Sequence, residues 1–271
     1  MREFWEKVGT VFYWIWQTLK WGFFALLLLV AILIGWLVHD IGVSTVREGD
    51  FTFSKYETEA RVSIYHGSEL AITLPDMVEE LPVTAFHAFT DLSGLVEEIT
   101  LPASVTECSV LGVEAPSLQA YHVVENHPTL REIDGALYSL DGTILYAYPQ
   151  GRTGVAVIPE GVTRIAEGAF YKSAASEVIL PQSLRHIERN TLGDFRVLYV
   201  LEIPAGVEEI DENAFAWKIG NDNRWHVRLI VTEGSVAHRF ALEHELTIRE
   251  VRPATGTDAP ADAEEPLAPA A

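Results

Sequence analysis

The sequence predicts a β-rich repeat solenoid, built of short parallel strands and turns with few short helices, and one transmembrane helix before it. The first observation is a phrase of similar residues that recurs at a spacing of 22 or 23 residues in its three clearest copies. The second is an uncharged apolar run near the N-terminus. Because a unit of this size cannot bury its apolar face alone, we expect the copies to stack on a shared core.

The repeated phrase opens with an aliphatic residue followed by proline. The three clearest copies begin at Ile158, Leu180 and Ile203, and two more begin at Leu74 and Leu101. A second column is occupied by Val78, Val105, Val162, Leu184 and Val207. A third column holds Leu81, Cys108, Ile165, Ile187 and Ile210. We therefore interpret Cys108 as a small buried hydrophobic residue rather than a nucleophile.

An insert of about residues 115–150 interrupts the array, because the spacing between Leu101 and Ile158 widens to 57 residues (158 − 101). Residues 118–123 supply apolar positions for one more coil of the stack. Two β-rich runs then meet at Asp141-Gly142, and Asp-Gly is typical of a type I′ turn, which needs positive φ. The insert is thus expected to form one coil and a protruding hairpin.

The folded ectodomain is placed at residues 60–251. Alternation over residues 61–66 predicts its first strand. Residues 39–59 before it are interpreted as a polar linker. After the ectodomain, residues 252–271 are dominated by Pro, Ala, Thr and acidic residues, which predicts a disordered tail.

An atypical unit is expected to close the ectodomain at about residues 228–251. Residues 228–231 predict a last strand, and Ser235 is suited to cap a helix that follows it. Apolar residues recur at roughly helical spacing at Val236, Phe240, Leu242 and Leu246. Such a unit covers the last open face of a solenoid.

The transmembrane prediction rests on Trp21–Val38, a run of 18 residues without charge. As a helix it would span about 27 Å, close to the hydrocarbon thickness of a bilayer. Arg2, Lys7 and Lys20 precede the run, and the next basic residue is Arg47. The positive-inside rule therefore predicts a cytoplasmic N-terminus and an external chain after the span. Residues 1–20 would be a short cytoplasmic or interfacial segment.

Two other interpretations of this run compete with an uncleaved anchor. A cleaved signal peptide is less favoured, because the run is long for its apolar region and no Ala-x-Ala-like site follows before Asp40. A buried globular helix is less favoured, because such a helix is rarely apolar on every face over this length.

Composition argues against several classes of function. The chain has 19 Lys and Arg against 39 Asp and Glu, a net charge of −20, which disfavours nucleic acid and, for the folded part, anionic lipid headgroups. One cysteine allows neither an intrachain disulfide nor a cysteine-based zinc site. No nucleotide-binding or nucleophile-elbow motif is present, and His226, His238 and His244 lack metalloprotease spacing. We predict no catalytic residue, metal site or cofactor, and no enzyme activity.

One feature is a candidate for function. If the residue before each proline points inward, strand alternation sends the preceding residue outward. The rule gives Thr73, Thr100, Val157, Ile179 and Glu202, and Ile230 holds the corresponding place at the last strand, so the partner-facing strip consists of these six residues. Such an extended surface is what solenoids use to bind partners. The competing interpretation is that a loop covers the strip, or that isolated exposed apolar residues have no role.

The columns resemble the BspA-like, or Treponema-type, leucine-rich repeat, with its pattern Ile/Leu-Pro-x-x-Val-x-x-Ile-x-x-x-Ala-Phe. The insert resembles that family's interruption in Asn126-x-Pro128, the run Asp134–Gly142, and Leu145-x-x-Tyr-Pro149. The resemblance spans about residues 60–251 and implies a leucine-rich-repeat solenoid on a surface-exposed or secreted bacterial protein, with recognition and sometimes adhesion roles. The chain departs from the better-known adhesins in its few repeats, its N-terminal anchor and its lack of a wall-sorting motif.

The predicted function is a membrane-anchored extracellular binding module for an unknown protein or cell-surface ligand. The alternative is a structural or regulatory ectodomain subunit of a membrane complex, with residues 4–38 as the contact element. Five of the seven tryptophans fall in or beside that element, at Trp5, Trp14, Trp16, Trp21 and Trp36.

Overall fold

The computed structural model describes residues 44–92, 94–106, 113–192, 195, 198, 200–215 and 227–254. The predicted span Trp21–Val38, residues 1–20, Cys108, His226 and most of the predicted tail lie outside these residues. Among the residues described, no helix is long and apolar enough to cross a membrane. The chain divides into two compact units, Met1–Ser44 with Lys55–Glu57, and Thr45–Ser54 with Thr58–Ala271. The repeat array lies in the second unit.

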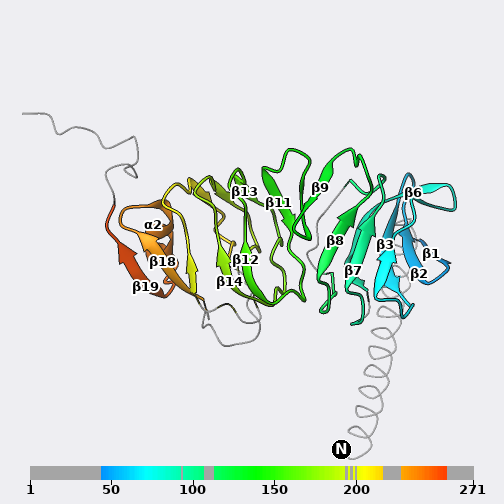
Figure 1. Ribbon diagram of the computed structural model, residues 1–271, viewed down its shortest axis with the longest axis horizontal. Helices are drawn as coiled ribbons and strands as arrows, with labels where there is room; N and C mark the ends of the chain where they lie inside the picture. The colour runs from blue at the N-terminus through cyan, green and yellow to red at the C-terminus, as the bar shows by residue number, and fades with distance from the viewer. Residues whose placement is uncertain are drawn as a thin grey trace, which may run out of the picture. The chain divides into compact units, whose positions relative to one another are not determined.

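One flank of the second unit carries three small sheets of parallel strands, visible along the lower side of Figure 1. Their strands are β4 (Ala71–Thr73), β7 (Glu98–Leu101) and β8 (Ala120–Val123); β12 (Gly154–Val157) and β14 (Ala175–Ile179); and β16 (Val200–Glu202), β18 (Arg228–Thr232) and β19 (Ile248–Arg252).

The other flank carries one six-stranded sheet in the order β17-β15-β13-β11-β10-β9. Its strands are β9 (Leu130–Ile133), β10 (Ala136–Ser139), β11 (Ile144–Ala147), β13 (Arg164–Ile165), β15 (His186–Ile187) and β17 (Glu209–Ile210). From β11 to β17 the strands are parallel, so equivalent residues of successive coils stand side by side.

The predicted columns form the core between the two flanks. The five opening residues of the phrase are at most 7% exposed, and the second-column residues are at most 2% exposed. In the third column, Ile165 lies beside Ile187, and Ile187 beside Ile210. The expected solenoid is therefore confirmed for the described repeats. Its buried residues form two clusters, one with the copies at Leu74 and Leu101 and one with the copies at Ile158, Leu180 and Ile203.

The first copy of the phrase departs from this pattern. Glu79 and Glu80 have φ of 45° and 68°, which makes a tight two-residue turn between β5 (Met77–Val78) and β6 (Leu81–Asp91). Leu81 is consequently half-buried and does not join the column of Ile165. The long β6 then runs parallel to β3 (Ala60–Tyr65).

The predicted linker at residues 39–59 is wrong in its second half, because it contains β1 (Ser44–Glu48) and β2 (Phe51–Lys55). Both belong to a five-stranded sheet in the order β1-β2-β3-β6-β5. The physical reason is aromatic burial. Phe53 is fully buried, and Phe51 packs on Tyr65 with ring centroids 4.9 Å apart.

The insert also differs from its prediction. Asp134 and Gly135 both have positive φ, 49° and 73°, and they join the antiparallel strands β9 and β10, so the type I′ geometry occurs there. At Asp141-Gly142 only Gly142 has positive φ. The hairpin of β10 and β11 does not protrude, because β11 pairs with β13 and all four residues of β10 are buried.

The predicted capping helix is present as α2 (Val236–Glu243). The Ser235 side chain accepts a hydrogen bond from the His238 amide, as expected of an N-cap. The helix buries Ala237, Phe240 and Ala241, whereas Leu242 is exposed. The strand β19 after it was not expected from the sequence.

The assignment of core and surface can be tested by making the same change, isoleucine to alanine, at two positions. Ile165→Ala removes a fully buried side chain, and we predict a loss of about 2–5 kcal/mol in the free energy of unfolding. Ile179→Ala changes a side chain that is 47% exposed, and the expected loss is about 0.5 kcal/mol. Urea unfolding of both variants measures the difference. Equal losses would contradict the assignment of core and surface.

Candidate functional site

All six residues of the predicted strip lie on the outer side of the three small sheets. Val157 and Ile179 are 61% and 47% exposed, Thr73 and Glu202 are exposed, and Thr100 and Ile230 are half-buried. Strand pairing places these residues side by side in three pairs, which are Thr73 with Thr100, Val157 with Ile179, and Glu202 with Ile230. The outward direction is thus established, and the binding role remains a prediction.

The strip extends to residues that were not predicted from the repeat phrase. His122 follows Thr100 in register on β8, and its ring contacts the carboxylates of Glu98 at 3.5 Å and Glu132 at 3.0 Å. Val155, which is 50% exposed, adds a third aliphatic side chain to β12 and β14. The signal for both was strand alternation, in a segment without the aliphatic-Pro opening for His122 and two residues before the strip position Val157 for Val155.

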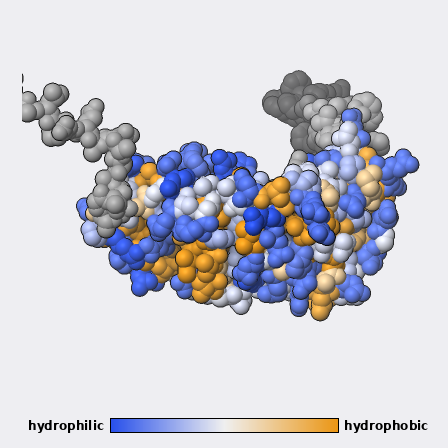
Figure 2. Space-filling view, turned by 45° about the horizontal axis from the view of Figure 1, so that its top comes forward, coloured by the Kyte–Doolittle hydropathy of each residue, from blue (hydrophilic) through white to orange (hydrophobic). Residues whose placement is uncertain are grey.

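A groove of about 510 Å³ lies between β14 and β16. Three strip residues, Ile179, Glu202 and Ile230, are among its lining residues, as are Glu177 and Arg249. Its volume falls in the range of about 300–1,000 Å³ that is common for ligand sites. Hydrophobic patches also interrupt the hydrophilic surface seen in Figure 2. Sequence reasoning missed this groove, because it depends on a break between two sheets.

The charges around the groove are partly paired. Glu202 forms an ion pair with Arg252, which also contacts Glu250 at 3.2 Å. The hydrogen bond to Glu250 and the charge of Glu202 raise the pKa of Arg252. No ion pair to Glu177 is found within the described ranges. The groove therefore presents one unpaired carboxylate on its β14 side.

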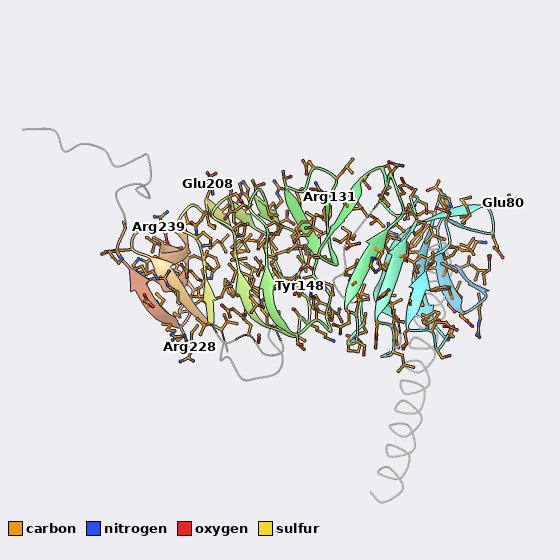
Figure 3. The ribbon with its side chains drawn as sticks, in the orientation of Figure 1. Glu80, Arg131, Tyr148, Glu208, Arg228 and Arg239 are labelled. Carbon is orange, nitrogen blue, oxygen red and sulfur yellow. The ribbon has the colours of Figure 1, made fainter. Side chains whose placement is uncertain are left out.

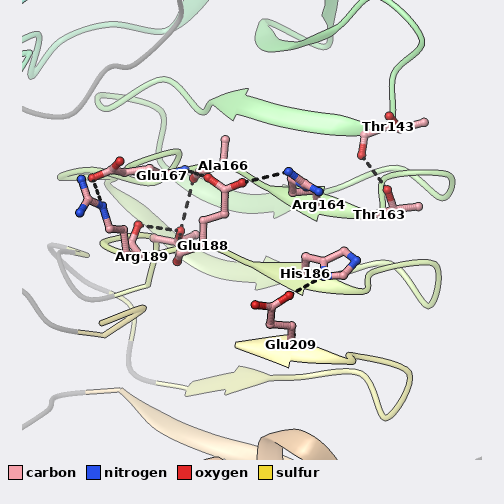
Figure 4. A network of polar contacts seen from close by, with 10 residues as sticks. Thr143, Thr163, Arg164, Ala166, Glu167, His186, Glu188, Arg189 and Glu209 are labelled. Carbon is pink, nitrogen blue, oxygen red and sulfur yellow. Dashed lines mark hydrogen bonds and ion pairs between the residues drawn. The ribbon is translucent and has the colours of Figure 1, made fainter. Parts of the chain in front are cut away.

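The opposite flank carries a polar network that connects successive coils, shown in Figure 4. His186 Nδ1 lies 3.3 Å from Glu209 Oε2, and Arg189 Nε lies 2.8 Å from Glu167 Oε1. Arg164 reaches Glu188 at 3.4 Å. Each pair joins residues 22 to 24 positions apart, which is one repeat. The network is best explained as bonding between coils.

No cluster of three or more His, Cys, Asp or Glu residues suited to a metal ion occurs among the residues that the structure describes. The histidines singled out by sequence have local partners. His238 Nδ1 accepts from the Gly234 amide at 3.1 Å, and the ring of His244 stacks on Phe240 with centroids 4.2 Å apart. Both therefore serve the ends of α2.

The shifted ionisable groups also have structural causes. Hydrogen bonds from Ser139 and Thr143 lower the pKa of Asp141 to about 2. Amides of the next coil, Gln182 and Ser183, hold the pKa of Glu160 below its ordinary value. Burial raises the pKa of Tyr148, which Figure 3 places inside the stack. None of these groups faces the groove between β14 and β16.

Comparison with known proteins agrees with the repeat pattern. The family model described as the BspA type leucine rich repeat region matches residues 150–221, in 6 copies. The match includes the three copies that begin at Ile158, Leu180 and Ile203. No curated protein matches the chain.

Similar solved structures are bacterial leucine-rich repeat proteins of low identity. One from Eubacterium ventriosum is 19% identical over 64% of this chain, with a TM-score of 0.40, and the match spans 59% of that protein. A leucine rich cell surface protein from Faecalibacterium prausnitzii is 13% identical, with 79% of this chain and 96% of that chain covered and a TM-score of 0.32. The T. pallidum leucine rich repeat protein is 18% identical, with 78% and 83% covered and a TM-score of 0.29.

The lowered pKa of Asp141 predicts a dependence of stability on pH. Because its pKa falls from 3.8 to about 2 on folding, the carboxylate stabilises the fold above pH 4, and this contribution is lost as the pH falls toward 2. Asp141→Asn should lower the free energy of unfolding at pH 7. At about pH 2 the variant and the unaltered protein should have the same free energy of unfolding. Urea unfolding across this range measures it, with Asp50→Asn as the control. A deficit independent of pH would contradict the assignment.

Proposed function

We propose that this chain is a membrane-anchored, extracellular binding module that presents a protein or cell-surface ligand site on a leucine-rich-repeat solenoid. The observation that supports it most is the meeting of the outward strip with the groove between β14 and β16. Half-exposed Val157 and Ile179 lie side by side there, on a framework fixed by buried columns. A repeat scaffold with an exposed, partly apolar strip is suited to recognition.

The proposal includes the anchor at Trp21–Val38, with residues 1–20 on the cytoplasmic side and the repeats outside a bacterial cell. It is supported by the uncharged length of the run and by the basic residues before it. The strong negative charge of the chain supports a protein partner over nucleic acid.

The strip can be tested with the double variant Thr100→Glu, Ile179→Glu in intact cells. Placing carboxylates at two strip positions should remove most of the partner that photo-crosslinking captures from the cell surface, because charges would have to be desolvated in the contact. The control Ile64→Glu changes an isoleucine that is 40% exposed on β3. Unchanged capture by the double variant would show that the strip is inert.

Replacing Trp21–Val38 with an unrelated span separates this function from the membrane-subunit alternative. A pure extracellular binder should keep its crosslinked partner. Loss of the partner on this replacement, with the strip variants unaffected, would favour a subunit that uses residues 4–38 for contact.

A further inference from the structure

We propose that the groove between β14 and β16 binds an extended, basic segment of another protein, which adds its main chain to the open edge of β14. This inference rests on the proposed function and names the class and mode of the partner. Three features of the groove carry it: unpaired main-chain groups, apolar side chains beside them, and the charge at its rim.

The open edge is seen by comparing equivalent bonds along the solenoid. In three coils, the amide of the residue before proline donates a hydrogen bond to the main-chain carbonyl of the strip residue in the next coil. These bonds run from Leu74 to Thr100, from Ile158 to Ile179 and from Ile203 to Ile230, each at 3.0 Å. The same bond from Leu180 to Glu202 is not found in the described chain, and β14 and β16 belong to separate sheets. The ladder along this flank is therefore interrupted between β14 and β16, as it also is between β8 and β12.

The hydrogen bonds that β14 makes to β12 and β16 makes to β18 show which main-chain groups of β14 and β16 face the gap. The Ile179 carbonyl accepts from Ile158, so it points toward β12. Main-chain groups of successive residues in a parallel strand point to alternate sides, so those of Val178 and Leu180 face β16. By the same rule, the Ile203 amide faces β18 and the main-chain groups of Glu202 face β14. Donors and acceptors thus face the gap from both strands.

The groove gives a ligand access to these groups. Val178 and Leu180 point inward and are only 5% and 7% exposed, yet both line the groove, which therefore reaches the backbone of β14. A peptide lying along such an edge gains affinity from main-chain hydrogen bonds and specificity from alternate side chains. Ile179, Ile230 and Val200 supply apolar surface for those side chains.

Charge selects the kind of segment. Of the two carboxylates that line the groove, Glu202 is paired with Arg252, and Glu177 has no ion pair among the described residues. Arg249 also lines the groove, and the chain as a whole has a net charge of −20. A cationic segment is attracted to such a surface. The chain's own residues 255–271 are an unsuitable occupant, because they contain four acidic residues, no Lys or Arg and three prolines. A second copy of the chain is disfavoured by its identical charge.

The experiment measures the binding of a labelled peptide, (Val-Lys)4, to the full chain in detergent by fluorescence anisotropy at 150 mM salt. We expect binding of (Val-Lys)4 and no binding of (Val-Glu)4. Methylation of alternate peptide amides should weaken binding about tenfold by removing main-chain donors. Ile179→Asn should also weaken it about tenfold, through loss of apolar contact, while the control Ile64→Asn leaves it unchanged.

Three results would overturn the inference: no binding of (Val-Lys)4, equal binding of the methylated peptide, or equal effects of Ile64→Asn and Ile179→Asn. The last would mean that the peptide is held by net charge alone. Failure of this inference is distinguishable from failure of the proposed function. If peptide binding fails but Thr100→Glu, Ile179→Glu still abolishes crosslinking on cells, the strip binds a partner in another way.

Discussion

The structure depends on burial between neighbouring coils. No single coil encloses Ile165, Ile187 or Ile210, and each of these side chains is covered because the equivalent residue of the next coil lies beside it. The opening residues of the phrase and the residues of its second column are buried in the same way. Stability in such an array is approximately the sum of coil and interface contributions. The ends must therefore be closed, which α2 does at one end by covering the last coil with Phe240 and Ala241.

Polar groups also form their bonds between one coil and the next. Glu160 accepts hydrogen bonds from the amides of Gln182 and Ser183, and Ser183 Oγ donates to the Val162 carbonyl. These bonds satisfy the turns that a buried column alone would leave unpaired. The step from β14 to β16 lacks such a ladder bond on one flank, although β15 and β17 still pair on the other. This opening between β14 and β16 is where binding is proposed.

Much of this architecture could be predicted, because the buried columns repeat with a fixed period and require aliphatic residues. The outward strip followed from the same alternation. The strands of residues 44–55 could not be predicted from the phrase, since their burial depends on the contact of Phe51 with Tyr65. The type I′ turn was placed at Asp141-Gly142 rather than at Asp134-Gly135, because both dipeptides have the same propensity and only strand pairing distinguishes them. The groove was missed because no motif marks a missing hydrogen bond.

If burial between neighbouring coils holds the fold together, removing one whole coil should preserve the buried columns, whereas removing part of a coil should break them. The most direct measurement compares cooperative urea unfolding of two deletions. Removing residues 180–202, one full repeat, joins equivalent positions of neighbouring coils, and we predict a single transition with a smaller m-value, since less surface is exposed on unfolding. Removing only residues 180–190 breaks the columns and should abolish the cooperative transition. If the shorter deletion unfolded as cooperatively as the longer one, burial between repeats would not be what holds the fold together.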